Sequence, residues 1–129
     1  MRHNITAIFL SLLLILLLSA CGTHENTQDE DLMELNSLYS QIENIIGDAA
    51  SDDPANCRVI GIGAKPCGGH WKYKVYSVQD TDTLLLSAIV ELHYQKEKAF
   101  NHKWGICSDC MAVGPPRLAC EDGHCVPVY

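Results

Sequence analysis

The sequence predicts an α+β domain in which two helices pack on a small antiparallel sheet and disulfides staple the fold. Three observations predict it. Segment 29–50 repeats apolar residues at three- and four-residue intervals, as an amphipathic helix does. Segment 71–78 alternates in the two-residue period of a strand with one buried face. Six cysteines fall between residues 57 and 125, a density typical of small exported domains.

The chain begins with a leader. Residues 7–20 are almost wholly Leu, Ile, Ala and Phe after a single charge at Arg2, the layout of a secretory signal peptide. Ser19 and Ala20 directly before Cys21 resemble the bacterial lipobox, which implies cleavage after residue 20 and acylation of Cys21. Gly22 in place of an Asp favours the outer membrane in a host that has one. The alternatives are an ordinary signal peptide with an incidental Cys, or an uncleaved anchor.

The mature chain is one domain preceded by a short tether. We expect the tether at 21–28 and a single domain at 29–129, with an acidic helix at 29–50 and a Cys-rich body at 57–129. The apolar face of the helix consists of Leu32, Leu35, Tyr39, Ile42, Ile46 and Ala49. Asp29, Glu30 and Asp31 suit the positive end of the helix dipole, and Pro54 prevents continuation.

The body is predicted to contain short strands and a second helix. Strands are expected at 58–62 and 71–78, joined by the Gly- and Pro-containing turn 63–69. Residues 80–83 offer N-cap candidates for a helix at about 84–100. The remainder is predicted as strands at 111–113, 117–120 and 126–129, with a hairpin turn at 121–124 that contains Asp-Gly.

Charge is divided unevenly along the chain. Residues 24–53 hold nine acids and no Lys or Arg, whereas eight bases face seven acids from Pro54 onward. An acidic segment beside a lipid anchor is repelled by anionic head groups and would hold the domain off the membrane; simple solubility explains it equally well. Because no basic stripe or cluster is present, nucleic-acid binding is not expected.

The cysteine count agrees with export. Seven cysteines less the acylated Cys21 leaves an even number, and an oxidising compartment favours three disulfides without fixing which of fifteen pairings forms. Cys107 and Cys110 have the spacing of a thiol-disulfide oxidoreductase, but Pro115 and Pro116 prevent the helix that such a site needs. A zinc site would need Cys107, Cys110, Cys120 and Cys125 with His124, and thiolates are disfavoured there. We therefore expect structural disulfides and no metal at Cys57, Cys67, Cys107, Cys110, Cys120 and Cys125.

Several short motifs of the body resemble a group of small bacterial lipoproteins. The most specific is the Lys-Pro-Cys-Gly-Gly element at 65–69; Ser108-Asp109-Cys110 and the Cys-x4-Cys tail at 120–125 complete it. The chain departs from the pattern in having His70 where Pro is common and in the additional Cys107. The resemblance implies a lipoprotein and no particular activity.

No catalytic or cofactor-binding motif is found in the sequence. The five histidines after the leader are scattered and are interpreted as single surface or turn residues. We expect a non-enzymatic, membrane-anchored binding or structural module without a cofactor, whose partner is an envelope protein. The alternative is a surface protease inhibitor that presents Pro116, Arg117 and Leu118 on a loop between cysteines, because a rigid loop loses little entropy on binding.

Overall fold

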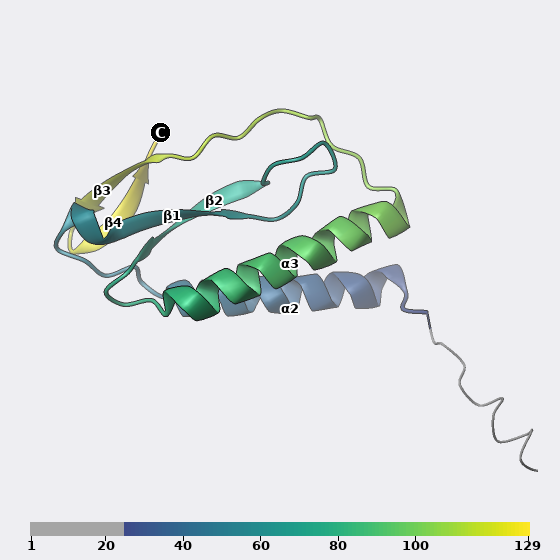
Figure 1. The fold of residues 1–129 in the computed structure, drawn as a ribbon, viewed down its shortest axis with the longest axis horizontal. Coiled ribbons are helices and arrows are strands. Elements are labelled where there is room, and N and C mark those ends of the chain that lie inside the picture. Colours follow the sequence, from purple (N-terminus) through teal and green to yellow (C-terminus); the bar gives the residue numbers. More distant parts are fainter. Residues whose placement is uncertain (1–24) are drawn as a thin grey trace, which may run out of the picture.

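The computed structural model of the chain describes residues 25–129. The predicted leader at 1–20 and Cys21 lie outside the described residues. Two long antiparallel helices lie side by side, the β1–β2 hairpin covers them, and the β3–β4 hairpin lies at the end where α2 finishes and α3 begins (Figure 1). The elements are α2 (Gln28–Ile46), the 3-10 turn η1 (Pro54–Asn56), β1 (Cys57–Ile62), β2 (Lys72–Ser77), α3 (Thr83–Trp104), β3 (Arg117–Glu121) and β4 (His124–Val128).

Helix α2 has defined stops at both ends. Thr27 caps it through a reciprocal box with Glu30, so the helix begins at Gln28, one residue before the predicted start. Gly47, with φ of 57°, ends the helix before the predicted residue 50. The buried face consists of Leu35, Leu38, Ile42 and Ile46.

Helix α3 is longer than the sequence predicted. Asp82 caps its start by accepting from the Leu85 N–H at 2.9 Å, and Gly105 ends it in the left-handed conformation. Its last turn is tied to the first turn of α2, because Asp31 accepts from Lys103 Nζ at 2.8 Å and from Trp104 Nε1 at 3.0 Å. These two hydrogen bonds, the one from Lys103 first, hold the pKa of Asp31 below its ordinary value.

The β1–β2 hairpin is covered on both faces, which corrects the expectation of one buried face. Ile60, Ile62 and Tyr76 pack against the helices in the larger core cluster, with Ile42, Ile46, Leu86 and Val90. On the opposite face, Cys57 and Val75 pack against Cys125 of β4 in a second cluster. The sheet is therefore the middle layer between the helix pair and the C-terminal hairpin.

Strands β3 and β4 form a separate two-stranded sheet rather than extending the first. The turn is Asp122-Gly123, both with positive φ, as the Asp-Gly signal predicted. The expected strand at 111–113 is absent: that segment is exposed and irregular, and prolines at 115 and 116 follow it. A short bridge between Ala50 and His124 joins this hairpin to the loop after α2.

The Lys-Pro-Cys-Gly-Gly element holds the irregular segment 106–116 in place. Cys67 is bonded to Cys110. The buried Lys65 donates to the Met111 carbonyl at 2.6 Å and lies 3.5 Å from Asp109. Gly68 and Gly69 have backbone φ angles of 95° and 81°, which residues with a Cβ atom rarely adopt. The motif thus acts as a two-point clamp, one point covalent and one ionic.

Candidate functional site

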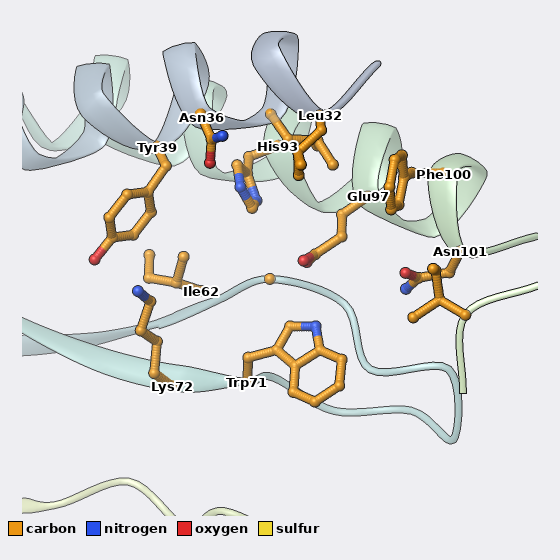
Figure 2. Close-up of a pocket in the computed structure, with 13 residues that line it drawn as sticks. Leu32, Asn36, Tyr39, Ile62, Trp71, Lys72, His93, Glu97, Phe100 and Asn101 are labelled. Atoms are coloured by element: carbon orange, nitrogen blue, oxygen red, sulfur yellow. The ribbon is translucent and has the colours of Figure 1, made fainter. Parts of the chain in front are cut away.

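A cavity of about 520 Å³ opens between α2, α3 and the β1–β2 hairpin (Figure 2). Its wall is mostly apolar, with a few polar groups converging on one side, the usual composition of a small-molecule site. Helix α2 contributes Leu32, Leu35, Asn36 and Tyr39; α3 contributes His93, Glu97, Phe100 and Asn101; Ile62, Gly63, Trp71, Lys72 and Ile106 complete it.

His93 is the least satisfied polar side chain in this wall. It is 6% exposed, and its Nδ1 has no hydrogen-bond partner among residues 25–129. Burial lowers the pKa of the imidazole; Glu97 acts against this shift, and Lys72 adds to it. The ring is therefore neutral near pH 7 and lines the cavity (Figure 2), while its unpartnered Nδ1 is almost completely covered by neighbouring protein atoms.

Glu97 and Asn101 fix the opposite wall through the backbone of Ala64. Glu97 Oε2 accepts from the Ala64 N–H, and Asn101 Nδ2 donates to the Ala64 carbonyl at 2.7 Å. This contact requires glycine at position 63, where an added Cβ would lie 2.6 Å from Glu97 Oε2. The two side chains are thus committed to the loop, which leaves His93 as the polar group free to meet a ligand.

The remaining polar side of the wall is cationic and aromatic. Lys72 Nζ lies 3.8 Å from the centroid of the Tyr39 ring, a cation–π contact across the cavity mouth. Trp71 faces the cavity, and Lys65 lies 5.1 Å from its ring centroid. A ligand here would meet aromatic faces, the Lys72 ammonium and the Glu97 carboxylate.

Sequence reasoning missed this site. His93, Glu97 and Asn101 recur at four-residue spacing, so they share one face of α3, and Leu86 and Val90 extend that face as apolar residues. Three polar residues in line on the buried side of a helix are costly unless partnered or functional. That polar stripe was the sequence signal from which the site could have been predicted. The interpretation of His93 as a surface or turn residue was wrong, because the side chain is buried.

The structure forms two disulfides, not the three expected. Cys57 pairs with Cys125 and Cys67 with Cys110, whereas Cys107 and Cys120 are unpaired within residues 25–129. These two cysteines do not pair because they are far apart in space. Cys107 follows the end of α3, whereas Cys120 is in β3 at the opposite end of the molecule (Figure 1). The same separation prevents the four-cysteine zinc set from assembling.

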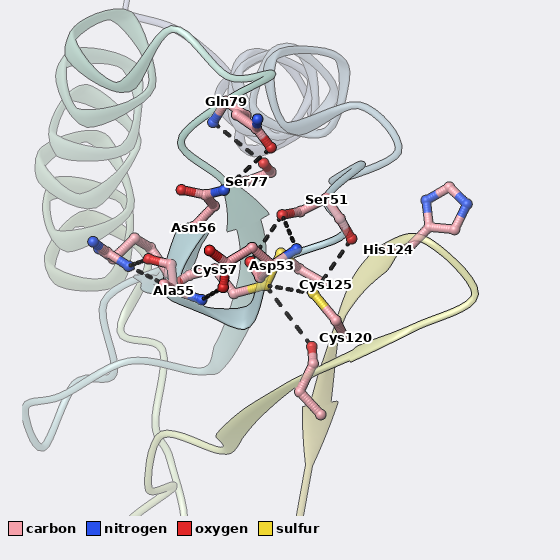
Figure 3. Close-up of a disulfide and its surroundings, with 12 residues drawn as sticks. Ser51, Asp53, Ala55, Asn56, Cys57, Ser77, Gln79, Cys120, His124 and Cys125 are labelled. Atoms are coloured by element: carbon pink, nitrogen blue, oxygen red, sulfur yellow. Dashed lines mark hydrogen bonds between the residues drawn. A yellow bond between two sulfur atoms is a disulfide. The ribbon is translucent and has the colours of Figure 1, made fainter.

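Cys120 instead lies against the first disulfide. Its Sγ is 3.6 Å from Cys57 Sγ, and the sulfur atoms of Cys57, Cys120 and Cys125 all lie within 4.8 Å of one another (Figure 3). Two of the three are bonded together, so the group is a disulfide with an adjacent thiol.

The segment Pro116-Arg117-Leu118 is a strand start rather than a projecting loop. Pro116 is buried, Leu118 packs on the second core cluster, and only Arg117 is exposed. Arg117 and Leu118 pair with Val128 and Pro127 of β4. The residues that protrude are those of the preceding segment, 107–115.

No protein-family model, curated protein or solved structure matches this chain. Across the described range, 25–129, neither helix combines the length and apolar composition needed to cross a bilayer.

Proposed function

We propose that this chain is a non-enzymatic binding module of the bacterial envelope, anchored by lipid at Cys21, that holds a small and largely apolar ligand between α2, α3 and the β1–β2 hairpin. The observation that carries the proposal is the unpartnered ring nitrogen of buried His93 in an otherwise apolar cavity. A buried polar group without a partner costs about 1–3 kcal/mol. A ligand that displaces the side chains covering this nitrogen and bonds to it removes that cost.

The wall indicates the class of ligand. Neutral imidazole donates or accepts according to its tautomer, so a hydroxyl matches it in either form. Trp71, Tyr39 and Phe100 suit an aromatic or alicyclic body, and the opposite charges of Lys72 and Glu97 favour an uncharged one. The ligand is therefore a small, neutral molecule with an apolar ring system and a hydroxyl group.

Tryptophan fluorescence gives a direct test, because Trp71 lines the cavity. We expect the oxidised protein to bind the uncharged dye N-phenyl-1-naphthylamine and simple phenols, with a change in tryptophan emission, and bound phenol to displace the dye. Asn36→Phe places a bulky ring at the exposed mouth without adding a tryptophan and should abolish both effects. Ser37→Phe, at the next exposed position of the same helix and outside the cavity wall, is the matched control. Equal binding by both variants would place the ligand elsewhere.

The anchor is tested separately. The resemblance of the Lys-Pro-Cys-Gly-Gly element to small lipoproteins and the lipobox-like Ser19-Ala20-Cys21 support it. Cys21→Ala should prevent incorporation of a fatty-acid analogue and leave the protein unprocessed. Unchanged labelling of that variant would overturn the anchor while leaving the ligand site intact.

The protease-inhibitor hypothesis has less support. It requires Pro116 to Leu118 to enter a protease cleft, and Pro116 is buried while Arg117 and Leu118 are paired with β4. Its test is inhibition of trypsin at near-stoichiometric concentration that Arg117→Ala removes. Unaffected trypsin would end the hypothesis for that protease class.

A further inference from the structure

The sulfur cluster at the C-terminal hairpin has a geometry suited to chemistry. Cys120 and Cys125 are opposite one another in the β3–β4 register, so both side chains lie on the same face of the hairpin. That face meets Cys57 at the start of β1. One cysteine of the first sheet therefore has two possible partners on the second, and it is bonded to one of them (Figure 3).

The thiol of Cys120 is oriented by a backbone acceptor. Its Sγ donates to the Ser51 carbonyl at 3.3 Å, and the same sulfur lies 3.6 Å from Cys57 Sγ. Since the one hydrogen of the Cys120 thiol is donated to Ser51 and Cys57 is already oxidised, the Cys120–Cys57 sulfur contact is a non-bonded approach. Loss of its proton would leave a thiolate 3.6 Å from Cys57 Sγ, and a rotation of the Cys120 side chain would bring it in line with the Cys57–Cys125 bond for attack.

We propose that Cys57, Cys120 and Cys125 form an internal thiol–disulfide exchange site. The Cys120 thiolate attacks Cys57 Sγ, a Cys57–Cys120 bond forms, the Cys57–Cys125 bond breaks, and Cys125 leaves as the thiolate. The proton lost by Cys120 is recovered by Cys125 through solvent. One disulfide and one thiol are present before and after, so the step needs no external oxidant or reductant.

The hairpin does not have to detach for this exchange. Backbone hydrogen bonds hold it to the loop after α2 independently of the sulfurs: Cys125 N–H to the Ala49 carbonyl at 2.9 Å, and Ser51 N–H to the Gly123 carbonyl at 2.8 Å. His124 Nδ1 also lies 3.0 Å from the Asp48 carbonyl. The side chains can therefore change partners on a fixed backbone.

Exchange changes which thiol is accessible. Cys120 is half-buried, whereas Cys125 is 6% exposed. When Cys57 is bonded to Cys125, the free thiol is that of Cys120, which small disulfides and alkylating reagents can reach. When Cys57 is bonded to Cys120, the free thiol is that of Cys125, which is buried. The site thus controls the reactivity of a single thiol towards small sulfur reagents, and it is independent of the proposed ligand cavity.

Disulfide mapping of the oxidised full-length protein tests the proposal, with Cys107→Ser used throughout to remove the remote thiol. The protein is incubated near neutral and mildly alkaline pH, quenched in acid, alkylated in denaturant and cleaved at Glu121 or Asp122, which separates Cys120 from Cys125. We expect both Cys57–Cys125 and Cys57–Cys120 peptides. Their interconversion should speed up about tenfold per pH unit below the pKa of the attacking thiol, because only the thiolate attacks.

Two variants complete the test. Cys125→Ser, made in an oxidising compartment, should form the Cys57–Cys120 bond and keep the native circular dichroism spectrum. Cys120→Ser should show Cys57–Cys125 alone at every pH. The proposal is overturned if the Cys57–Cys120 peptide stays absent after hours of incubation, the timescale of uncatalysed reshuffling, or if Cys57 and Cys120 both remain thiols in a folded Cys125→Ser.

Discussion

The two faces of the β1–β2 hairpin are stabilised in different ways. Towards the helices, Ile42, Ile62 and Leu86 are almost completely buried in a continuous apolar cluster. Towards the C-terminal hairpin, the cluster is only Ala49, Cys57, Val75 and Cys125. On the helix side, the apolar side chains are numerous enough to stabilise the fold by packing, even though a cavity remains between them. The hairpin side is thin, so a covalent bond replaces packing there.

Within residues 25–129, the helix side contains a buried polar atom without a hydrogen-bond partner, and the hairpin side contains a cysteine without a disulfide partner. On the helix side it is the His93 ring nitrogen, and on the hairpin side it is the Cys120 thiol. The chemistry that each side offers follows from how it is held together. A packed layer with a cavity suits reversible ligand binding, and a disulfide with an adjacent thiol suits exchange.

The largest effect is expected from removing the covalent link on the hairpin side. Cys57→Ser removes the cysteine of β1, so no disulfide can join β1 to β3 or β4. Cys57 and Cys125 are 68 residues apart in sequence, and loop-closure entropy for that length corresponds to about 4 kcal/mol of stability. Denaturant unfolding of oxidised wild-type and variant measures it. A loss well under 1 kcal/mol would show that packing alone holds the hairpin.

A cavity on the helix side should cost somewhat less. Leu86 has no exposed surface, and Leu86→Ala is expected to lower the free energy of unfolding by about 3 kcal/mol through lost burial and an unfilled space. Leu84→Ala is the control, because Leu84 is 82% exposed on the same helix and should change stability little. A similar small loss for both variants would contradict the assignment of the main core to the helix side.

The sequence specified the elements better than their contacts. Both helices, both hairpins and the Asp-Gly turn were predictable, because periodicity and turn residues act locally. The alternation at 71–78 was read correctly as a strand, but period two does not reveal what covers the second face. Lys74 shows why: it looked solvent-facing, and it instead pairs with Glu43 of α2.

The candidate site was less predictable than the fold. The pairing of Cys57 with Cys125 depends on where the two hairpins meet, and the pairing of Cys67 with Cys110 depends on where the turn between β1 and β2 meets segment 106–116; no local spacing encodes either contact. The cavity depends on side chains from α2, α3 and β2 converging. Only the four-residue spacing of His93, Glu97 and Asn101 was visible in advance, and it gains meaning once that face of α3 is known to be buried.

A smaller effect is expected at His93, with a sign that separates binding from stability. His93→Phe removes the unpartnered buried nitrogen and should raise stability near pH 7 by about 1 kcal/mol while weakening ligand binding. Because burial lowers the pKa of His93 in the folded state, the unfolded chain binds a proton there first. Wild-type stability should therefore fall as pH drops below about 6.5, the ordinary histidine pKa, towards the lowered folded value.

The pH series compares three proteins so that other histidines cancel. His93→Phe should lose less stability than wild type over this acid range, whereas His102→Asn, at an exposed position of the same helix, should follow wild type. The groups around His93 are Glu97 on its own helix, Lys72 on β2 and Tyr39 on α2. Parallel curves for wild type and His93→Phe would show that the His93 ring is solvated in the folded protein.

The smallest effect is expected at the ion pair that joins the two layers on the helix side. Lys74 Nζ lies 2.7 Å from Glu43 Oε1, with both side chains partly exposed. Burial, the largest single cause, would raise the pKa of Glu43, but the hydrogen bonds from Lys74 and Tyr39 together with the charges of Lys74 and Lys72 outweigh it, and the pKa is lowered. The pair therefore stabilises the fold above the ordinary pKa of about 4.5, and this contribution is lost as pH falls through the lowered folded value.

Glu43→Gln should cost about 0.5 kcal/mol near pH 7, and less in high salt, since solvent and ions screen exposed pairs. Glu25→Gln, at an exposed position before α2, is the control. Unfolding curves in low and high salt measure the difference, and a salt-independent loss would mean that Glu43 contributes through packing rather than charge.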